Sequence, residues 1–476
     1  MKNSKQLIVD SKPETVNSEP LTVNHKLETV KIGLEIHVQL NTKSKLFCGC
    51  TTKEGNPNSH TCPTCLGMPG AKPRLNKKAI DFMIKICTAL KCTILTPSYF
   101  SRKTYFYPDL SKNYQITQYE TPLGRNGKLH VDGTTVRIKR VHLEEDPAAL
   151  EHTATGTLID YNRSGIPLAE IVTEPDIQSP EHARAFLKKI VNTLSYLNVT
   201  TPEMTIKADA NISIKKHKFM RVEIKNITGF KEIERALMYE AQRQEQENPI
   251  QETRRWDGTK TISMRTKETE EDYGYIYDPD LPQIIITKEH LESVQKEIPK
   301  LSDERVKEYT EKGVAQDDAE IITQDLYVAD LYELVAQKSN PVTASKWFRK
   351  EVLKRLNADE KTPADISINA LIDILKLLHE KKITEYTGRE LMTHLYDKTF
   401  KPKEHVQQSG TTMITDTTTL EHLCKEAIQK SSGAVEDYKK GQEKALNAIV
   451  GLVMKETKGT AKPDEVKRII EELLKT

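Results

Sequence analysis

The sequence predicts an α+β protein in which an antiparallel-sheet domain is followed by two helical domains, and three observations support this fold class. Residues 30–290 contain runs that alternate apolar and polar side chains between Gly and Pro turns, as half-buried strands do. Residues 291–405 become helical and charged, and residues 406–476 form a smaller helical unit after a polar linker. Residues 1–29 are polar and lack periodicity, so we expect a disordered leader there.

The composition is that of a multidomain globular protein, since 476 residues are too many for one hydrophobic core. The 71 Lys and Arg residues nearly balance 69 Asp and Glu residues, so any contact with nucleic acid must depend on local basic patches. No apolar run approaches the roughly 18–20 residues of a membrane helix, and the N-terminus lacks a signal-peptide pattern. We therefore expect a cytoplasmic protein that makes no contact with a membrane.

The strand predicted at Val30–Leu40 organises the sheet domain. Its apolar residues alternate without a break, which places Glu35 and His37 together on the polar face, with their Cα atoms about 6.5–7 Å apart. A carboxylate and an imidazole at this spacing can bind one metal ion or share one proton. The alternative interpretation is a solvated polar sheet face.

Four of the seven cysteines form two close pairs, one with the spacing Cys-x-Cys and the other Cys-x-x-Cys. Two such pairs joined by a turn-rich loop favour a structural Zn²⁺ site closed by four thiolates, which has no catalytic role. A redox pair or free thiols is the alternative. The remaining three cysteines are expected to pack in helical cores. The predicted zinc ligands are Cys48, Cys50, Cys62 and Cys65, and the packing cysteines are Cys87, Cys92 and Cys424.

The segment Ser101–Ile116 mixes cationic and aromatic residues, among them Arg102 and Lys112 beside several tyrosines. Cations and stacking rings suit phosphates and unpaired bases. A strand–turn–strand with an aromatic core explains the pattern equally well.

A second acidic strand is predicted at Val136–Asp146. The alternation slips at Arg140 and Val141, which indicates a bulge. Beyond it Glu144 shares the polar face with His142, whereas Glu145 points the opposite way if the strand persists. A solvated strand end is the alternative.

The run Pro167–Thr173 contains one charge, Glu170, among apolar residues, as expected of a buried strand. A buried carboxylate is costly unless it is protonated, paired with a cation or bound to a metal. Just upstream, Arg163 lies in a polar turn that could present a guanidinium group to an anion.

Two further runs, Thr205–Ile214 and Phe219–Ile227, predict an antiparallel hairpin that lines a cleft. Its polar face carries Asp209 on the first strand, and Glu223 and Lys225 on the second. Together the predicted strands offer carboxylates for Mg²⁺ and basic groups for phosphates, as a nucleotide site requires. Neither the P-loop sequence nor the kinase glycine loop is present.

Several motifs closely resemble the family of aspartyl/glutamyl-tRNA amidotransferase B subunits, in order from about residue 30 to the end of the sequence. They are Ile32–Leu40 (IGLEIHVQL), Tyr105–Asp109 (YFYPD), His142–Asp146 (HLEED), Asp160–Gly165 (DYNRSG), Glu170–Asp176 (EIVTEPD), Asp209–Ser213 (DANIS), Glu252–Arg255 (ETRR) and the tail motif Gly451–Gly459 (GLVMKETKG).

The resemblance implies a cradle-shaped catalytic domain at 30–290, a helical domain at 291–405 and a mobile tail at 406–476 that touches tRNA. It implies two protein partners, which are an amidase (the A subunit) that releases ammonia and a small protein (the C subunit). The expected reaction is ATP-dependent phosphorylation of the side-chain carboxylate of Glu or Asp misacylated on tRNA. Ammonia then displaces the phosphate to give Gln-tRNA or Asn-tRNA.

Combined with the strand faces, the resemblance implies a set of site residues. The expected Mg²⁺ ligands are Glu35, His37, Glu144 or Glu145, and Glu170, with Asp209 nearby. The candidates for contacts with phosphates or with the acceptor end of tRNA are Arg102, Arg163 and Lys225.

Two positions depart from the family pattern: Gly274 stands where arginine is usual, and Ile276 stands where phenylalanine is usual. Two rival functions remain open from the sequence. One is a non-catalytic, zinc-stabilised tRNA-binding scaffold, and the other is a free-standing kinase or ligase for a small carboxylate substrate. The tail argues against the second rival, because an enzyme that acts on a small molecule has no evident use for it.

Overall fold

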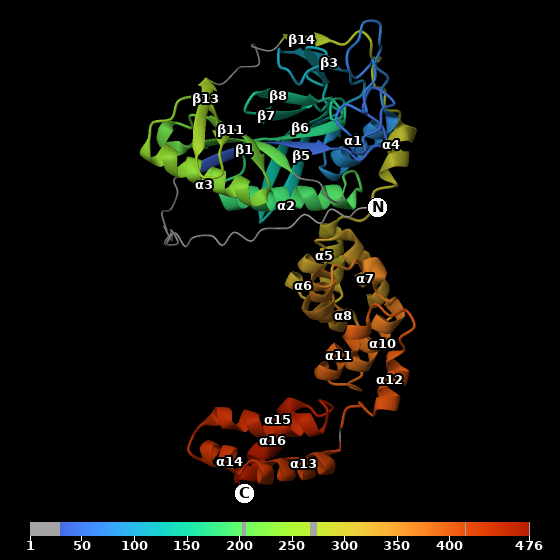
Figure 1. Cartoon of the computed structure of the whole chain (residues 1–476), viewed down its shortest axis with the longest axis vertical. Helices are drawn as coiled ribbons and strands as arrows, with labels where there is room; N and C mark the ends of the chain where they lie inside the picture. The colour runs from blue at the N-terminus through green and yellow to red at the C-terminus, as the bar shows by residue number, and fades with distance from the viewer. Residues whose placement is uncertain (1–28, 202–205, 267–273, 415, 476) are drawn as a thin grey trace.

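The computed structural model describes residues 29–201, 206–266, 274–414 and 416–475. The expected leader at 1–29 lies outside these residues apart from Thr29. The described residues form a large sheet domain followed by helices to the C-terminal end, which confirms the mixed α+β class (Figure 1).

The main sheet has nine strands in the order β13-β12-β11-β10-β1-β9-β6-β5-β2. Neighbouring strands are antiparallel except for β11 and β12, which are parallel. The strands are β1 (Val30–Gln39), β2 (Thr93–Ile94), β5 (Gly124–Val131), β6 (Thr134–Glu145), β9 (Pro167–Thr173), β10 (Lys207–Ile214), β11 (Val222–Thr228), β12 (Glu252–Trp256) and β13 (Thr261–Thr266).

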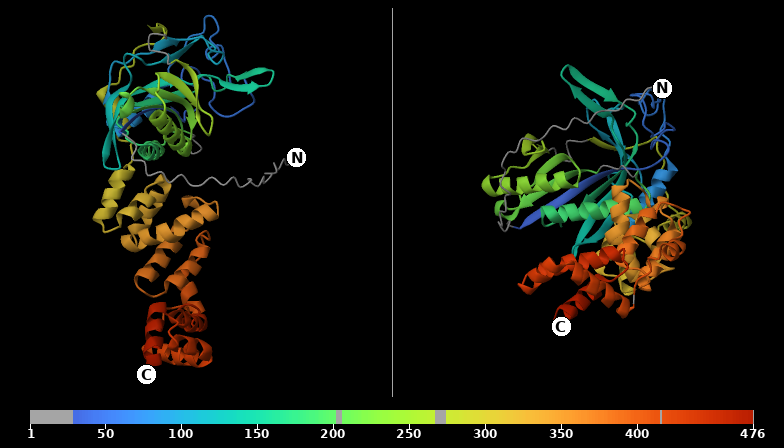
Figure 2. Two further views of the ribbon diagram at one scale, coloured as in Figure 1. Left: turned by 90° about the vertical axis from the view of Figure 1, so that its left-hand side faces the viewer. Right: turned by 60° about the horizontal axis from the view of Figure 1, so that its bottom comes forward.

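Two smaller sheets accompany the main sheet. One has the order β14-β3-β4, and the other is the hairpin β7–β8, which projects from the domain (Figure 2). Their strands are β3 (Ser101–Thr104), β4 (Tyr114–Thr117), β14 (Gly274–Tyr277), β7 (Ala149–Thr153) and β8 (Gly156–Asp160). The segment Ser101–Ile116 is thus a strand–turn–strand, in which the Arg102 guanidinium lies 4.6 Å from the Tyr114 ring centroid.

The apolar face of the main sheet is covered by helices α2 and α3, which run beneath it (Figure 1). The alternation predicted for β1 explains this burial, because Ile32, Ile36 and Val38 are completely inaccessible to solvent. Helix α2 begins at a Ser179 cap followed by Pro180, a combination that favours helix initiation. The helices of this domain are α1 (Lys77–Ala89), α2 (Pro180–Tyr196), α3 (Phe230–Gln246) and α4 (Lys288–Gln295).

The structure corrects two details of the predicted strands. The bulge in β6 falls between Ile138 and Arg140, slightly before the expected slip. Strand β11 begins at Val222, because Lys218 and Phe219 have positive φ angles and belong to the turn after β10.

The C-terminal half contains two further hydrophobic clusters, separate from the cluster of the sheet domain. The first spans Val306–Val406 and the second Ile414–Leu474. Their helices are α5 (Ser302–Glu311), α6 (Gln316–Ile322), α7 (Leu326–Ala336), α8 (Pro341–Trp347), α9 (Leu353–Ala358), α10 (Ile368–His379), α11 (Glu385–Leu391), α12 (Pro402–Ser409), α13 (Thr417–Lys430), α14 (Ser432–Lys439), α15 (Leu446–Glu456) and α16 (Pro463–Lys475).

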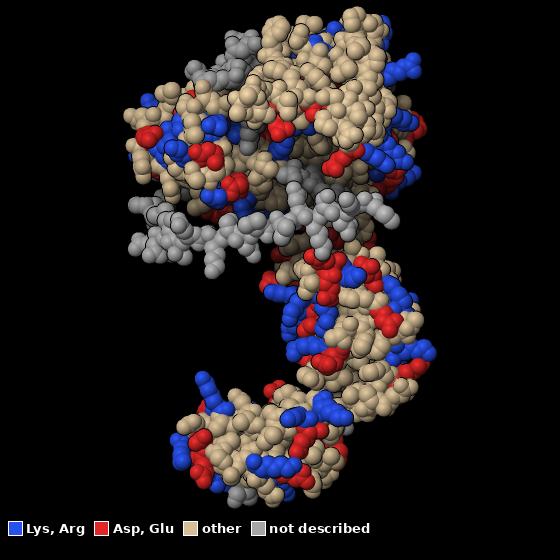
Figure 3. All heavy atoms as spheres, viewed as in Figure 1, with Lys and Arg blue, Asp and Glu red and all other residues tan. Residues whose placement is uncertain are grey.

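The helical region joins the sheet domain through α2. Tyr196 donates a hydrogen bond to the carbonyl of Thr323 at 2.9 Å, and Asn192 donates to the same carbonyl at 3.0 Å. Positive and negative side chains are interspersed on the face of these helices that Figure 3 shows. Within the described residues, none of the helices combines the length and apolar character that crossing a membrane requires.

Candidate active site on the polar face of the sheet

Three neighbouring strands bring two histidines and a buried carboxylate into one row across the polar face. In the strand register, Glu170 of β9 lies opposite His37 of β1 on one side and His142 of β6 on the other. One Glu170 oxygen, Oε2, lies 3.4 Å from the Nε2 atom of each imidazole. Sequence alternation placed the two histidines on this face and Glu170 was predicted on a buried strand, but only the register brings the three side by side.

Glu144 completes the first group of ligand atoms. Its carboxylate lies 3.5 Å from His142 Nε2 and accepts a hydrogen bond of 3.0 Å from the Thr117 hydroxyl of β4. His37, Glu144 and Glu170, which we call the histidine group, each offer an atom within 4.8 Å of the others.

A second group lies beside it on β1, β10 and β11. Glu35 is directly opposite Asp209, and these two residues with Glu223 offer ligand atoms within 4.8 Å of one another. We call these three residues the carboxylate group. The Lys225 ammonium contacts this group, at 3.1 Å from Asp209 and 3.6 Å from Glu223.

The charges of the two groups act on one another. Burial, followed by the nearby charges of Glu170 and Glu223, raises the pKa of Glu35. Burial opposes charge on His37 and His142, yet the surrounding carboxylates outweigh it and raise the pKa of each imidazole to about 9. Burial also opposes charge on Glu170, but the two histidines hold its pKa well below the usual value.

The donor sets fit divalent cations. The carboxylate group offers three oxygen ligands, the type that Mg²⁺ prefers. Once His37 loses its proton, the histidine group offers two carboxylates and an imidazole, a set that a softer divalent ion such as Mn²⁺ also accepts. His142 stands behind this group with its Nδ1 atom buried and without a hydrogen-bond partner in the described part of the chain.

Three residues predicted for the site lie elsewhere. Glu145 points away from Glu144, as strand alternation requires, and pairs with Lys112 at 2.6 Å and with the backbone N–H of Ile116 at 2.9 Å. It is therefore not part of the histidine group.

The two predicted arginines are also engaged away from the groups. Arg102 pairs with Asp278 at 3.0 Å and with Asp280 at 2.9 Å. Arg163 donates to the carbonyls of Pro147 and Ala148 at 2.9 and 2.7 Å. Lys225 contacts the carboxylate group, whereas Arg163 lies 3.6 Å from Asp146, just after the end of β6.

The structure adds Glu223 and Arg140 to the residues predicted for the site. Glu223 belongs to the carboxylate group, and its signal in the sequence was its place two residues before Lys225 on the same strand face. Arg140 lies 3.7 Å from Glu170, but it adjoins the bulge in β6, so its direction could not be read from alternation.

The four clustered cysteines converge in the loop after β1. Cys48, Cys50, Cys62 and Cys65 have sulfur atoms within 4.8 Å of one another, a donor set that fits tetrahedral Zn²⁺. A hydrogen bond from Cys48 lowers the pKa of Cys65 to about 4, and Lys45 lies 3.6 Å from the same sulfur. These contacts favour the thiolate form of Cys65, the form in which a cysteine binds a metal.

The two departures from the family pattern lie on β14. At Gly274 a Cβ atom would meet only the Thr104 side chain, at 3.7 Å, so the missing side chain leaves no tight contact. The Ile276 side chain is mostly exposed. Between them, Tyr275 stacks on Tyr119 with ring centroids 4.0 Å apart.

Comparisons with known proteins agree over nearly the whole chain. The family model described as the GatB/GatE catalytic domain matches residues 30–292, and the model described as the GatB domain matches residues 330–474. The aspartyl/glutamyl-tRNA(Asn/Gln) amidotransferase B subunit of Thermotoga maritima is 42% identical over 473 residues, covering 93% of this chain and 98% of its own length.

Proteins of the same name from Carboxydothermus hydrogenoformans and Brevibacillus brevis are each 41% identical, covering 93% and 94% of this chain and 98% and 99% of their own lengths. The resemblance found in the sequence motifs is thereby confirmed, and the chain belongs to the family of aspartyl/glutamyl-tRNA(Asn/Gln) amidotransferase B subunits.

Proposed function

We propose that this chain is the component of a tRNA-dependent amidotransferase that uses ATP to activate the side-chain carboxylate of Glu or Asp misacylated on tRNA. The names of the relatives support the amidotransferase assignment. The observation that carries the chemical assignment is the meeting of the histidine group and the carboxylate group on one sheet face. The non-catalytic scaffold is not favoured, because a scaffold would not require these acids to converge.

The proposed reaction has two steps. An oxygen of the substrate carboxylate attacks the γ-phosphorus of ATP, the bond to the β-phosphate oxygen breaks, and ADP leaves. Ammonia then attacks the acyl carbon of the mixed anhydride, inorganic phosphate leaves with the bonding electrons, and an amide forms with loss of a proton. The first step makes a good leaving group from an oxygen that ammonia could not otherwise displace.

This chemistry depends chiefly on positioning and charge neutralisation, which the described residues can supply. Mg²⁺ ions held by the histidine group (His37, Glu144 and Glu170) and by the carboxylate group (Glu35, Asp209 and the added Glu223) would neutralise phosphate charge when bound. The Lys225 ammonium, which pairs with Asp209 and Glu223, would contact a phosphate oxygen. The rigid sheet fixes these groups relative to one another.

The zinc ion is proposed to have a structural role in this function. The cysteine loop has few apolar residues of its own, so four thiolate–metal bonds would hold it in shape. Metal analysis of the purified protein should find about one zinc per chain. We expect Cys62→Ser to lower this ratio and to make the loop sensitive to proteolysis.

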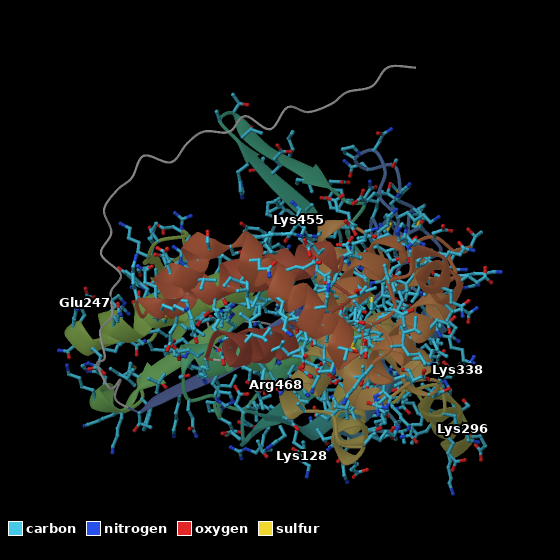
Figure 4. All side chains as sticks on the ribbon, turned by 90° about the horizontal axis from the view of Figure 1, so that it is seen from below. Lys128, Glu247, Lys296, Lys338, Lys455 and Arg468 are labelled. Carbon is cyan, nitrogen blue, oxygen red and sulfur yellow. The ribbon has the colours of Figure 1, made fainter. Side chains whose placement is uncertain are left out.

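The partners follow from the same proposal. An amidase, the A subunit, would supply ammonia, and the small C subunit would hold the two together, in the cytoplasm where aminoacylated tRNA is used. The tail, residues 406–476, would contact tRNA. Figure 4 shows Lys455 and Arg468 on the tail helices, and both side chains are exposed. The tail has its own hydrophobic cluster, so its removal takes Val406 from the cluster of the preceding helices and leaves the cluster of the sheet domain intact.

The direct test reconstitutes the complex with the A and C subunits and with misacylated tRNA. Without glutamine, the wild type should form ADP only when Glu-tRNA or Asp-tRNA is present, and hydroxylamine should trap the acyl phosphate. Glu170→Gln should abolish the trapped product. If that variant forms ADP and hydroxamate at the wild-type rate, the proposed site is wrong.

A second test separates the tail from the nucleotide site. Deletion of residues 406–476 should weaken the use of tRNA far more than the binding of ATP. Equal loss of both would contradict the division of roles.

A further inference from the structure

Strand β12 links the carboxylate group to the opposite face of the sheet. It runs parallel to β11, and its Thr253 lies directly opposite Glu223. Because side chains alternate along a strand, Thr253 shares the polar face with Glu223, whereas Glu252 and Arg254 point toward α3. The side chains of β12 therefore contact the carboxylate group on one face of the sheet and the charged residues next to α3 on the other.

On the polar face, Thr253 holds one oxygen of Glu223. Its hydroxyl donates a hydrogen bond of 2.9 Å to Glu223 Oε2, and only 2% of Thr253 is exposed to solvent. The other oxygen, Oε1, lies 3.6 Å from the Lys225 ammonium. The hydrogen bond thus decides which Glu223 oxygen faces Lys225 and the rest of the carboxylate group.

On the opposite face, a separate buried network joins the side chains of β12 and β13 to α3. Arg254 donates to Glu252 at 2.6 Å and to the Thr261 hydroxyl at 2.9 Å. Thr261 in turn donates to the buried Glu240 of α3 at 2.7 Å. None of these bonds involves the Thr253 hydroxyl, whose bond to Glu223 lies on the polar face.

We infer that Thr253 is a positioning residue that orients Glu223 for a divalent cation in the carboxylate group, an inference that rests on the proposed function. Without the hydroxyl, Glu223 Oε2 loses a buried donor, and the carboxylate gains by turning toward Lys225. That closer ion pair competes with a cation for Glu223. Loss of a side chain that orients a metal ligand typically lowers metal affinity about 10- to 100-fold.

The test measures binding of Mn²⁺ alone to the full-length chain by electron paramagnetic resonance, with thermal unfolding recorded in parallel. Thr253→Val keeps the side-chain size and should raise the Kd of the affected Mn²⁺ about 10-fold, while Thr253→Ser should return it to within about threefold of the wild type. Thr253→Ala also removes the hydroxyl but adds no second γ-methyl group, so it replaces the valine variant in the test if that variant does not fold.

Thr261→Val is the matched control. Thr261 lies on the neighbouring strand β13 and, like Thr253, is buried and donates a hydrogen bond to a glutamate. Its partner is Glu240 of α3, on the face turned away from the carboxylate group. We expect it to lower thermal stability and to leave Mn²⁺ affinity within about twofold of the wild type. A merely structural role for Thr253 predicts that both valine variants behave alike.

Glu223→Gln distinguishes failure of this inference from failure of the proposed function. If Glu223→Gln leaves Mn²⁺ binding unchanged, the carboxylate group does not bind the ion and the proposed assignment fails. If Glu223→Gln weakens binding but Thr253→Val and Thr253→Ala do not, or if serine does not restore it, the role of Thr253 is wrong.

Discussion

The polar face of the main sheet and the opposite face, which packs on α3, carry charges that are arranged in different ways. Beneath β12, Glu240 and Glu252 are paired with Arg243 and Arg254, and this pairing lowers the pKa of Glu252. On the polar face, neighbouring carboxylates add to burial and raise the pKa of Glu35. The first set is compensated by its own partners, whereas the second keeps like charges together. A fold retains such repulsion where a ligand of opposite charge relieves it, and this contrast separates structural from functional acids.

The largest expected effect is on the compensated side. Glu240 is fully buried and accepts bonds from Arg243, Gln244 and Thr261. Glu240→Gln would leave the buried guanidinium groups of Arg243 and Arg254 to share Glu252 as their buried counter-charge, and breaking a buried ion pair typically destabilises a protein by about 3–5 kcal/mol. We expect the midpoint of thermal unfolding of the sheet domain to fall by about 10 °C. A midpoint unchanged within about 2 °C would show that the network is not structural.

The complementary variant, on the polar face, should lower activity more than it lowers stability. Glu170→Gln removes a proposed metal ligand, so we expect the rate of tRNA-dependent ADP formation to fall at least about 100-fold. The unfolding midpoint without metal should fall less than in Glu240→Gln, because the two histidines beside Glu170 can give up their protons and become neutral. A large loss of stability with a normal rate would remove the distinction between the two faces.

The pH dependence of stability sharpens the comparison further. The folded-state pKa of Glu252 is lowered, since hydrogen bonds from Ser263 and Arg254 outweigh the effect of burial. The contribution of the Glu252 charge to the free energy of unfolding is therefore present above the unfolded-state pKa of about 4.5. It is lost as the pH falls through the lower folded-state pKa.

Urea unfolding should accordingly show Glu252→Gln to be about 2 kcal/mol less stable than the wild type at pH 7. The difference should shrink below about pH 4. A difference that stays constant over this range would mean that the charge of Glu252 does not contribute.

Strand alternation predicted much of this site, because it fixes the face of each side chain. It placed Glu35 and His37 on a polar face, whereas Glu170 was identified as the one charge in an apolar run, and the family resemblance suggested that these residues meet. It could not place Arg102, whose partners Asp278 and Asp280 lie some 176 and 178 residues further along the chain. Nor could it identify the buried network, because Glu240 looks like an ordinary polar residue of an amphipathic helix until β12 and β13 pack against α3.

The smallest effect tests the alternation argument itself, at the adjacent acids of β6. Glu144 contacts His142 and the Thr117 hydroxyl, whereas Glu145 pairs with Lys112. Glu144→Gln should therefore raise the Kd for Mn²⁺ about 10-fold, and Glu145→Gln should change it less than about twofold. Because both substitutions remove one negative charge from the same strand end, a general electrostatic effect would weaken binding similarly in both. Equal weakening would mean that the face of the strand does not separate these two acids, and the histidine group would have to be redrawn to include Glu145.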